Sequence, residues 1–333
     1  MPRHKHIRAD KVAIPNTTNG KYQPAGLWQL LGFNERIDQL QGEVGYTTIG
    51  INGTAHRRNW SAIQPLNATT YDWSYVDAAV QLAIQMGKRL SVLVSMGIDC
   101  PPWVFATPGM TTFTSSTGLV YPAPWDTKYQ AVLKTFIKAF GARYDTNPLF
   151  AYVTMAGWGK DHFMQLCLSS TDNATLAATT YNGVTGNQLW NNAFSQILAM
   201  WQAAFPNTKL IANYLGVTFP TESDTLAIAA SNAGKAQAGN QFGIKWNNAD
   251  VFVNETSGPP YAFMLANTLT NPAGYQMAHT FTDYSQTIDI VKTNLGWFME
   301  LYAKQINNNP DLMIPDNNHF IDYVNPLTTV KSW

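Results

Sequence analysis

Glu300 is the residue whose type and position most strongly suggest a chemical role. Glutamate is scarce, with only five in 333 residues, and Glu300 lies inside the apolar run 297–302. An unpaired carboxylate in such a run costs several kcal/mol. Glu300 therefore either takes part in catalysis or forms a buried ion pair, for which the available bases are Arg57, Arg58 and Lys245.

Three further carboxylates follow apolar segments that suit buried strands. They are Asp161, Asp99 and Glu255. Two carboxyl groups that converge at strand ends can act as general acid and general base. The alternatives are a capping or surface role for Asp161, a turn residue for Asp99 and an exposed loop position for Glu255.

Alternating strands and helices must position these side chains. Apolar, β-branched runs predict eight strands, at residues 27–31, 46–51, 90–96, 150–155, 210–215, 241–246, 275–279 and 297–301. Helical periodicity predicts a helix capped by Asp72 or Ser74 and ended by Gly87, and a helix over 129–144 opened by Asp126. Further helices are predicted at 35–40, 190–205, 225–236, 261–269 and 284–295. The last thirty residues show no regular pattern.

Eight strands separated by helices fit an α/β fold of the closed (β/α)8 TIM barrel type, in a single domain. An open doubly wound sheet is the competing fold. It usually carries a glycine-rich phosphate loop, and neither G-x-G-x-x-G nor G-x-x-x-x-G-K-[ST] occurs here. We predict an N-terminal arm over residues 1–25, and over 26–333 a barrel with long loops on its C-terminal face.

The composition excludes several kinds of partner. Only 13% of residues are charged, the net charge is zero and 45% of residues are hydrophobic, so neither nucleic acid nor a membrane is an expected partner. The low charge resembles that of secreted proteins, and we expect an extracellular monomer whose signal peptide is absent from this sequence. Cys100 and Cys167 are predicted to lie close enough for a disulfide, which would agree with secretion; the alternative is two free, partly buried thiols.

Two segments resemble a known family. Residues 58–65 (RNWSAIQP) and 70–77 (TYDWSYVD) resemble the W-x-x-(I/L)-(E/Q)-P and Y-D-W-S-x-(L/I)-D motifs of barrel glycoside hydrolases, the β-galactosidase-like and cellulase-like families. Residues 124–126, 142–145 and 147–148 also resemble the segment before strand four in those proteins. The resemblance covers roughly residues 46–161 and implies a TIM barrel that hydrolyses glycosidic bonds.

The chain departs from that family at its catalytic pair. The resemblance implies one glutamate after strand four and another on strand seven. Here strand four is followed by Trp158-Gly159-Lys160-Asp161, and the predicted strand seven has no carboxylate. Hydrolysis needs two carboxyl groups, about 5 Å apart for retention of configuration or 6.5–9.5 Å for inversion. We therefore predict Glu300 and Asp161 as the catalytic residues of a branch that lacks the usual pair of glutamates.

Aromatic and polar side chains after strands are the predicted substrate-binding residues. The tryptophans could stack on sugar rings or could simply pack over the barrel rim. We expect a groove lined by Trp60, Trp103 and Trp158, with His56 and Arg58 on its floor or wall. The full predicted binding set is His56, Arg58, Trp60, Asp99, Trp103, Trp158, Glu255 and His279.

Two functions follow from these residues. The first is a glycoside hydrolase acting on a polysaccharide or oligosaccharide through a carboxylate pair. The alternative is a non-catalytic carbohydrate-binding or structural barrel that has lost the pair. No metal or cofactor is predicted, because H-E-x-x-H does not occur and no H-x-H pattern follows a predicted strand.

Overall fold

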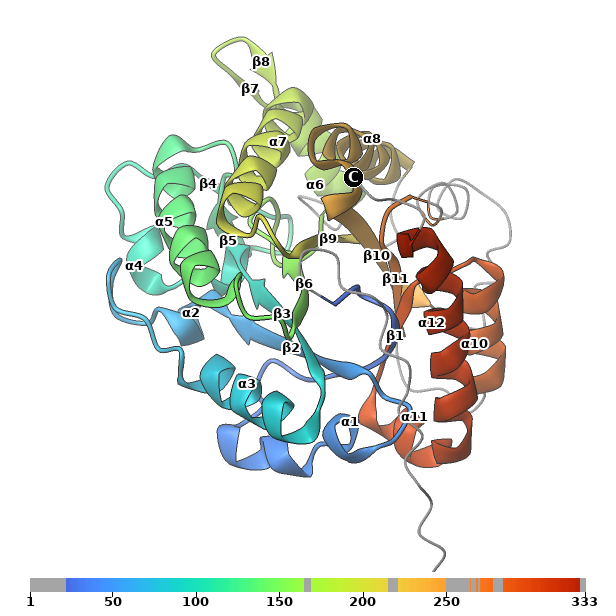
Figure 1. The fold of residues 1–333 in the computed structure, drawn as a ribbon. Coiled ribbons are helices and arrows are strands. Elements are labelled where there is room, and N and C mark those ends of the chain that lie inside the picture. The colour runs from blue at the N-terminus through green and yellow to red at the C-terminus, as the bar shows by residue number, and fades with distance from the viewer. Residues whose placement is uncertain are drawn as a thin grey trace, which may run out of the picture.

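A computed structural model describes residues 22–164, 169–214, 221–249, 264, 268, 270–277 and 284–329. Eight parallel strands close into a barrel in the order β1-β12-β11-β10-β9-β6-β3-β2 (Figure 1). The strands are β1 (Gly26–Leu30), β2 (Gly53–Asn59), β3 (Arg89–Ser95), β6 (Phe150–Met155), β9 (Lys209–Tyr214), β10 (Phe242–Ala249), β11 (Ala273–Met277) and β12 (Phe298–Leu301). The predicted single-domain TIM barrel is confirmed.

Helices surround the barrel (Figure 1). The α-helices are α1 (Val44–Thr47), α2 (Trp60–Ile63), α3 (Ser74–Met86), α4 (Pro102–Phe105), α5 (Thr127–Tyr144), α6 (Ser170–Ala178), α7 (Gly186–Ala204), α8 (Thr221–Ala238), α10 (Tyr284–Thr293), α11 (Ala303–Asn308) and α12 (Met313–Thr329). Short 3-10 helices cover Ile37–Gly42, Gly97–Asp99, Gly239–Gln241 and Pro310–Leu312. Two small hairpins pair β4 (Thr112–Thr114) with β5 (Val120–Pro122) and β7 (Thr180–Tyr181) with β8 (Val184–Thr185).

The helix boundaries follow the local sequence signals. Helix α3 ends at Gly87, whose φ of 63° is the left-handed conformation that glycine adopts without strain. Helix α5 begins after Asp126, whose carboxylate accepts hydrogen bonds from the backbone N–H groups of Lys128 and Tyr129. Both boundaries agree with the sequence prediction.

The alternation of strand side chains is seen most clearly in β12. Phe298 and Glu300 face the barrel interior, where both contact Tyr152 of β6. Met299 and Leu301 face the opposite way and join the core between the sheet and the helices. The alternation of side chains along a strand thus accounts for the inward orientation of Glu300.

The prediction of a strand at 46–51 is wrong. Tyr46 lies in α1, and the second barrel strand, β2, begins only at Gly53. Gly53 fits because a Cβ atom there would lie 2.5 Å from both the Arg89 carbonyl oxygen and the Trp28 ring. The sequence pattern did not predict this strand because its residues, GTAHRRN, are mostly polar. In the barrel their side chains find interaction partners on both faces of the sheet.

The prediction of an irregular C-terminus is also wrong. Helices α11 and α12 occupy most of it, and Asn317 of α12 accepts a hydrogen bond from the backbone N–H of Leu27 at 2.8 Å. Pro315 hides the helical pattern, yet it falls in the first turn of α12, where a missing N–H is tolerated.

The described part of the chain includes no helix that is both long and apolar enough to cross a membrane. Residues 1–21 lie outside it, so the N-terminal arm remains a prediction.

Candidate active site

Two loops at the C-terminal ends of neighbouring strands β3 and β6 are joined to each other. The backbone N–H of Ile98 donates to the carbonyl oxygen of Lys160 at 2.7 Å. Gly97 permits this approach, because its φ is +63° and a Cβ atom on it would lie 2.1 Å from the same oxygen. These loops carry Asp99 and Asp161, so the joint fixes the two carboxylates at the barrel mouth. We call the following group of residues the mouth: Phe33, Arg57, Ser95, Asp99, Lys160, Asp161 and His162.

The two carboxylates have different surroundings. Asp99 is half-buried and accepts a hydrogen bond from the Ser95 hydroxyl at 2.6 Å. Burial raises the pKa of Asp99, the Ser95 hydrogen bond opposes this rise, and the negative charge of Asp161 adds to it. Asp161 pairs with Lys160 at 3.0 Å and accepts from the Phe163 N–H at 3.0 Å. One group is thus biased towards the protonated form, and the other has a cation beside it.

His162 lies beside Asp161 and Ser95. Its Nδ1 atom is 3.4 Å from the Ser95 hydroxyl and 3.9 Å from a carboxylate oxygen of Asp161. Burial lowers the pKa of His162 to about 4, despite the opposing effect of Asp161, and nearby cations including Arg57 contribute to the decrease. The ring is therefore neutral at pH 7. The ring also contacts the Phe163 and Phe33 rings, with centroids 4.2 and 5.3 Å away.

Helix α7 holds the loop that carries Asp161. The indole N–H of Trp190 donates to the carbonyl oxygen of Trp158 at 2.6 Å, and that of Trp201 donates to Ala156 at 3.0 Å. Gly157 makes the turn between these two carbonyl groups with a φ of +117°. Both helical tryptophans therefore fix the start of the loop.

Three buried polar side chains point into the upper part of the barrel interior. Thr154, Asn213 and Asn247 each lie two residues beyond an inward-facing residue of β6, β9 or β10, towards the C-terminal ends of the strands. The Thr154 hydroxyl and both amides have no hydrogen-bond partner among the described residues. An unpaired buried polar group costs about 1–3 kcal/mol, so a bound ligand rich in hydroxyl groups would satisfy them.

Glu300 is not part of the mouth, and its carboxylate forms the ion pair considered above as the alternative to catalysis. Its oxygens accept from the Lys245 ammonium at 2.7 and 2.8 Å and from the Tyr152 hydroxyl at 2.7 Å. The Lys245 side chain is 1% exposed and that of Glu300 is 0% exposed. Burial lowers the pKa of Lys245, and the attraction of Glu300 opposes that decrease.

The predicted groove of tryptophans is wrong. Trp60 and Trp158 are completely buried. Trp60 packs against Phe136 of α5, with ring centroids 5.0 Å apart, and against Trp103 at 6.1 Å. The Trp103 indole donates to the Gln64 carbonyl oxygen at 2.9 Å. All three rings fill the layer between the strands and the helices, which is the packing interpretation considered for them.

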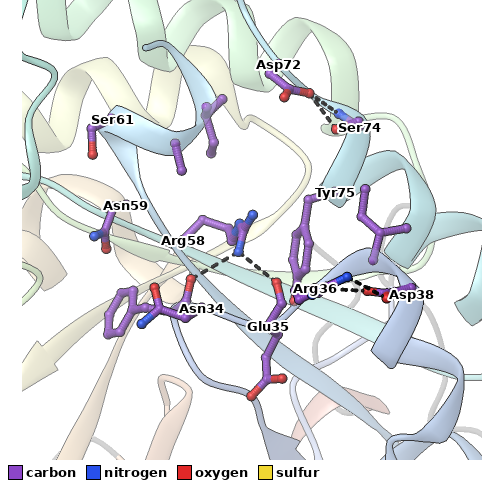
Figure 2. A pocket seen from close by; sticks show the side chains of 14 residues that line it. Asn34, Glu35, Arg36, Asp38, Arg58, Asn59, Ser61, Asp72, Ser74 and Tyr75 are labelled. Carbon is purple, nitrogen blue, oxygen red and sulfur yellow. Dashed lines mark hydrogen bonds and ion pairs between the residues drawn. The ribbon is translucent and has the colours of Figure 1, made fainter.

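His56 is also outside the mouth, because it faces the helices from the middle of β2. Its ring nitrogens lie 3.0 Å from the Tyr46 hydroxyl, 2.9 Å from that of Thr54 and 3.0 Å from that of Tyr75. The predicted place on a groove floor is wrong. Arg58, in contrast, lines an open pocket on the rim (Figure 2).

The buried state of His56 predicts loss of stability in acid. Burial, with a smaller contribution from Arg58, lowers the pKa of His56 from 6.5 to about 3. The unfolded chain therefore binds the proton first, and the free energy of unfolding should decrease as the pH falls from 6.5 to 3. The decrease is up to about 1.4 kcal/mol per pH unit for this histidine.

Urea denaturation of the wild type and of His56→Gln across this pH range checks the prediction. The variant should show a shallower dependence, with His162 accounting for part of what remains. An identical pH dependence in both proteins would contradict it.

Other predicted positions remain untested. Glu255, His279 and Cys167 lie outside the described residues. Cys100 is a buried free thiol, in disagreement with the predicted disulfide.

Sequence reasoning missed Phe33, Arg57, Ser95 and Lys160 as members of the mouth, although Ser95 ends a correctly predicted strand, which is a usable signal. The described residues contain no group of three or more potential metal ligands.

Neither a protein-family model nor a curated protein sequence matches the chain. Solved structures do match. The catalytic domain of β-amylase from Paenibacillus polymyxa aligns with a TM-score of 0.63 at 8% identity, over 92% of this chain and 99% of that one. A β-galactosidase from Marinomonas ef1 aligns with a TM-score of 0.53 at 10% identity, over 83% of this chain and 53% of that one.

An endo-β-1,4-xylanase of glycoside hydrolase family 10 from Gloeophyllum trabeum aligns with a TM-score of 0.50 at 13% identity, over 91% of this chain and 96% of that one. The three structures share the barrel fold with this chain, in agreement with the resemblance noted in its sequence. At these identities the likeness shows the fold alone.

Proposed function

We propose that the chain is a glycoside hydrolase in which Asp99 is the general acid and Asp161 is the second carboxylate. The observation that carries the proposal is the hydrogen bond between the β3 and β6 loops. It holds Asp99 and Asp161 at the C-terminal ends of barrel strands, in unlike environments. Active sites of this fold lie at that face. Two carboxyl groups whose surroundings favour different protonation states are the requirement for acid and base roles.

Each side chain then has a defined task. Asp99, with its raised pKa, donates a proton to the glycosidic oxygen as the bond breaks. Asp161, beside Lys160, provides the negative charge that attacks the sugar or activates water. The unpaired groups of Thr154, Asn213 and Asn247 would bind sugar hydroxyls below the mouth.

A polysaccharide or oligosaccharide is the proposed substrate class. The matched β-amylase, β-galactosidase and xylanase structures support this class. One observation favours the alternative, a carbohydrate-binding barrel without activity. Glu300, the strand-borne glutamate, is held in a buried ion pair with Lys245, away from solvent.

A polysaccharide panel separates the two functions. The purified chain is incubated with soluble starch, xylan, β-1,4-galactan and carboxymethylcellulose, and reducing ends and retardation in affinity gels are measured. We expect new reducing ends from at least one polymer. Retardation without product would support the non-catalytic barrel, and neither signal on any polymer would contradict both functions.

A further inference from the structure

A pocket of about 620 Å³ opens on the rim of the barrel, beside the mouth. One wall is the loop 33–38, which follows β1, and the other runs from the end of β2 to the start of α3. Figure 2 shows Arg58 at its centre, with Asn59 and Ser61 on one side and Tyr75 on the other. We call it the Arg58 pocket. Its volume is in the range of small-molecule binding sites.

Arg58 is held rigidly, yet part of its guanidinium remains available. Its Nη1 group donates to the carbonyl oxygens of Phe33 at 3.0 Å and Glu35 at 2.9 Å. The guanidinium carbon lies 3.9 Å from the centroid of the Tyr75 ring. The Nε and Nη2 groups have no hydrogen-bond partner in the described part of the chain. A planar donor fixed in this way loses little entropy when it binds hydrogen-bond acceptors.

The charges of the pocket select against an anion. Arg36 pairs with Asp38 at 2.8 Å, and the positive charge of Arg58 acts on the Asp72 carboxylate, which also lines the pocket. A phosphate group would meet this carboxylate and be repelled by it. A neutral ligand with many hydroxyl groups instead finds donors and acceptors together.

Asn59 and Ser61 add to this lining. Neither side chain has a hydrogen-bond partner among the described residues, and both are part-exposed in the pocket. Amide, hydroxyl, guanidinium and carboxylate groups together can satisfy both the donor and the acceptor capacity of sugar hydroxyls.

The pocket and the mouth share Phe33. This residue lines the pocket, while its ring contacts His162 of the mouth and lies under the Arg57 guanidinium, 4.9 Å from the centroid. We propose that the Arg58 pocket binds a distal sugar unit of an oligosaccharide whose scissile bond lies at the mouth, an assignment that rests on the proposed function. The substrate class is thus a neutral oligosaccharide long enough to pass Phe33, rather than a disaccharide.

Calorimetric titration of the whole chain tests the pocket independently of activity. The probes are xylohexaose, cellohexaose and maltohexaose, with xylobiose, cellobiose and maltose as the short counterparts. Asn59→Ala removes one hydrogen-bonding group, and Ser61→Trp fills the pocket. Lys134→Gln, an exposed change on α5, is the control.

We expect at least one hexasaccharide to bind the wild type and the control alike, Ser61→Trp to bind it at least tenfold more weakly, and Asn59→Ala to bind it about two- to tenfold more weakly, with similar melting temperatures. The corresponding disaccharide should lose less affinity. Binding lost in the pocket variants without hydrolysis by the wild type would support the pocket and contradict the proposed function. Hydrolysis with unchanged hexasaccharide affinity in both pocket variants, or no hexasaccharide binding by the wild type, would overturn the pocket assignment.

Discussion

Glu300→Gln is expected to lower the free energy of unfolding by about 3–5 kcal/mol, because the substitution leaves the Lys245 ammonium charged and unpaired inside the barrel. The side chains of Glu300 and Lys245 are almost completely buried, and the carboxylate also accepts a hydrogen bond from the Tyr152 hydroxyl. Urea denaturation at pH 7 measures the loss. Since Glu300 lies outside the proposed catalytic pair, the folded fraction of the variant should keep its turnover.

Two matched variants separate charge from packing at this ion pair. Tyr152→Phe removes only one hydrogen bond to the carboxylate and should cost about 1.5–3 kcal/mol. Replacing both charges, as Lys245→Met with Glu300→Leu, should recover most of the loss from the single change, because no unpaired charge remains. A folded Glu300→Gln protein with unchanged stability and no turnover would return Glu300 to the mechanism.

Asp99→Asn and Asp161→Asn should each lower kcat by a factor of about 10²–10⁴. An amide has nearly the shape of the carboxyl group, but it can neither donate the proton of an acid nor act as a base. Asparagine at 161 can still accept a hydrogen bond from the Phe163 N–H, but it loses the largely buried ion pair with Lys160, so the melting temperature should fall while the protein stays folded. A steady-state assay on the polymer identified in the panel gives kcat, and thermal unfolding provides the control.

The role of Asp99 as acid has two further signatures. Loss of activity in Asp99→Asn should be smaller on an aryl glycoside with a good leaving group, which departs without a proton. In the wild type, activity should fall as the pH rises through the pKa of Asp99, which burial raises above its ordinary 3.8. Equal losses on good and poor leaving groups would argue against this role.

Much of the fold follows from local patterns. Strand β3 and helices α3 and α5 are long or strongly periodic, and their ends carry recognisable capping residues. Strand β2 does not follow from a local pattern. His56 and Arg58 are polar and yet face the helices, where each contacts a partner distant in sequence. Only the tertiary structure supplies those partners.

The site was predictable in part. Asp99 and Asp161 stand out because each follows a strand that the sequence defines well. Their meeting depends on Gly97 lying against Lys160, a contact between loops more than sixty residues apart that no local pattern specifies. The inward direction of Glu300 followed from strand alternation, whereas the choice of Lys245 as its partner required the order of strands in the barrel.

The most direct measurement is product release from the polymer identified in the panel, by the wild type and by the double variant Asp99→Asn with Asp161→Asn, prepared in parallel and both shown to be folded at the assay temperature. Wild-type product, with none from the double variant, is the result that the proposed carboxylate pair predicts. Equal product from both proteins would place the chemistry elsewhere in the chain, and polymer binding without product from the wild type would contradict glycoside hydrolysis.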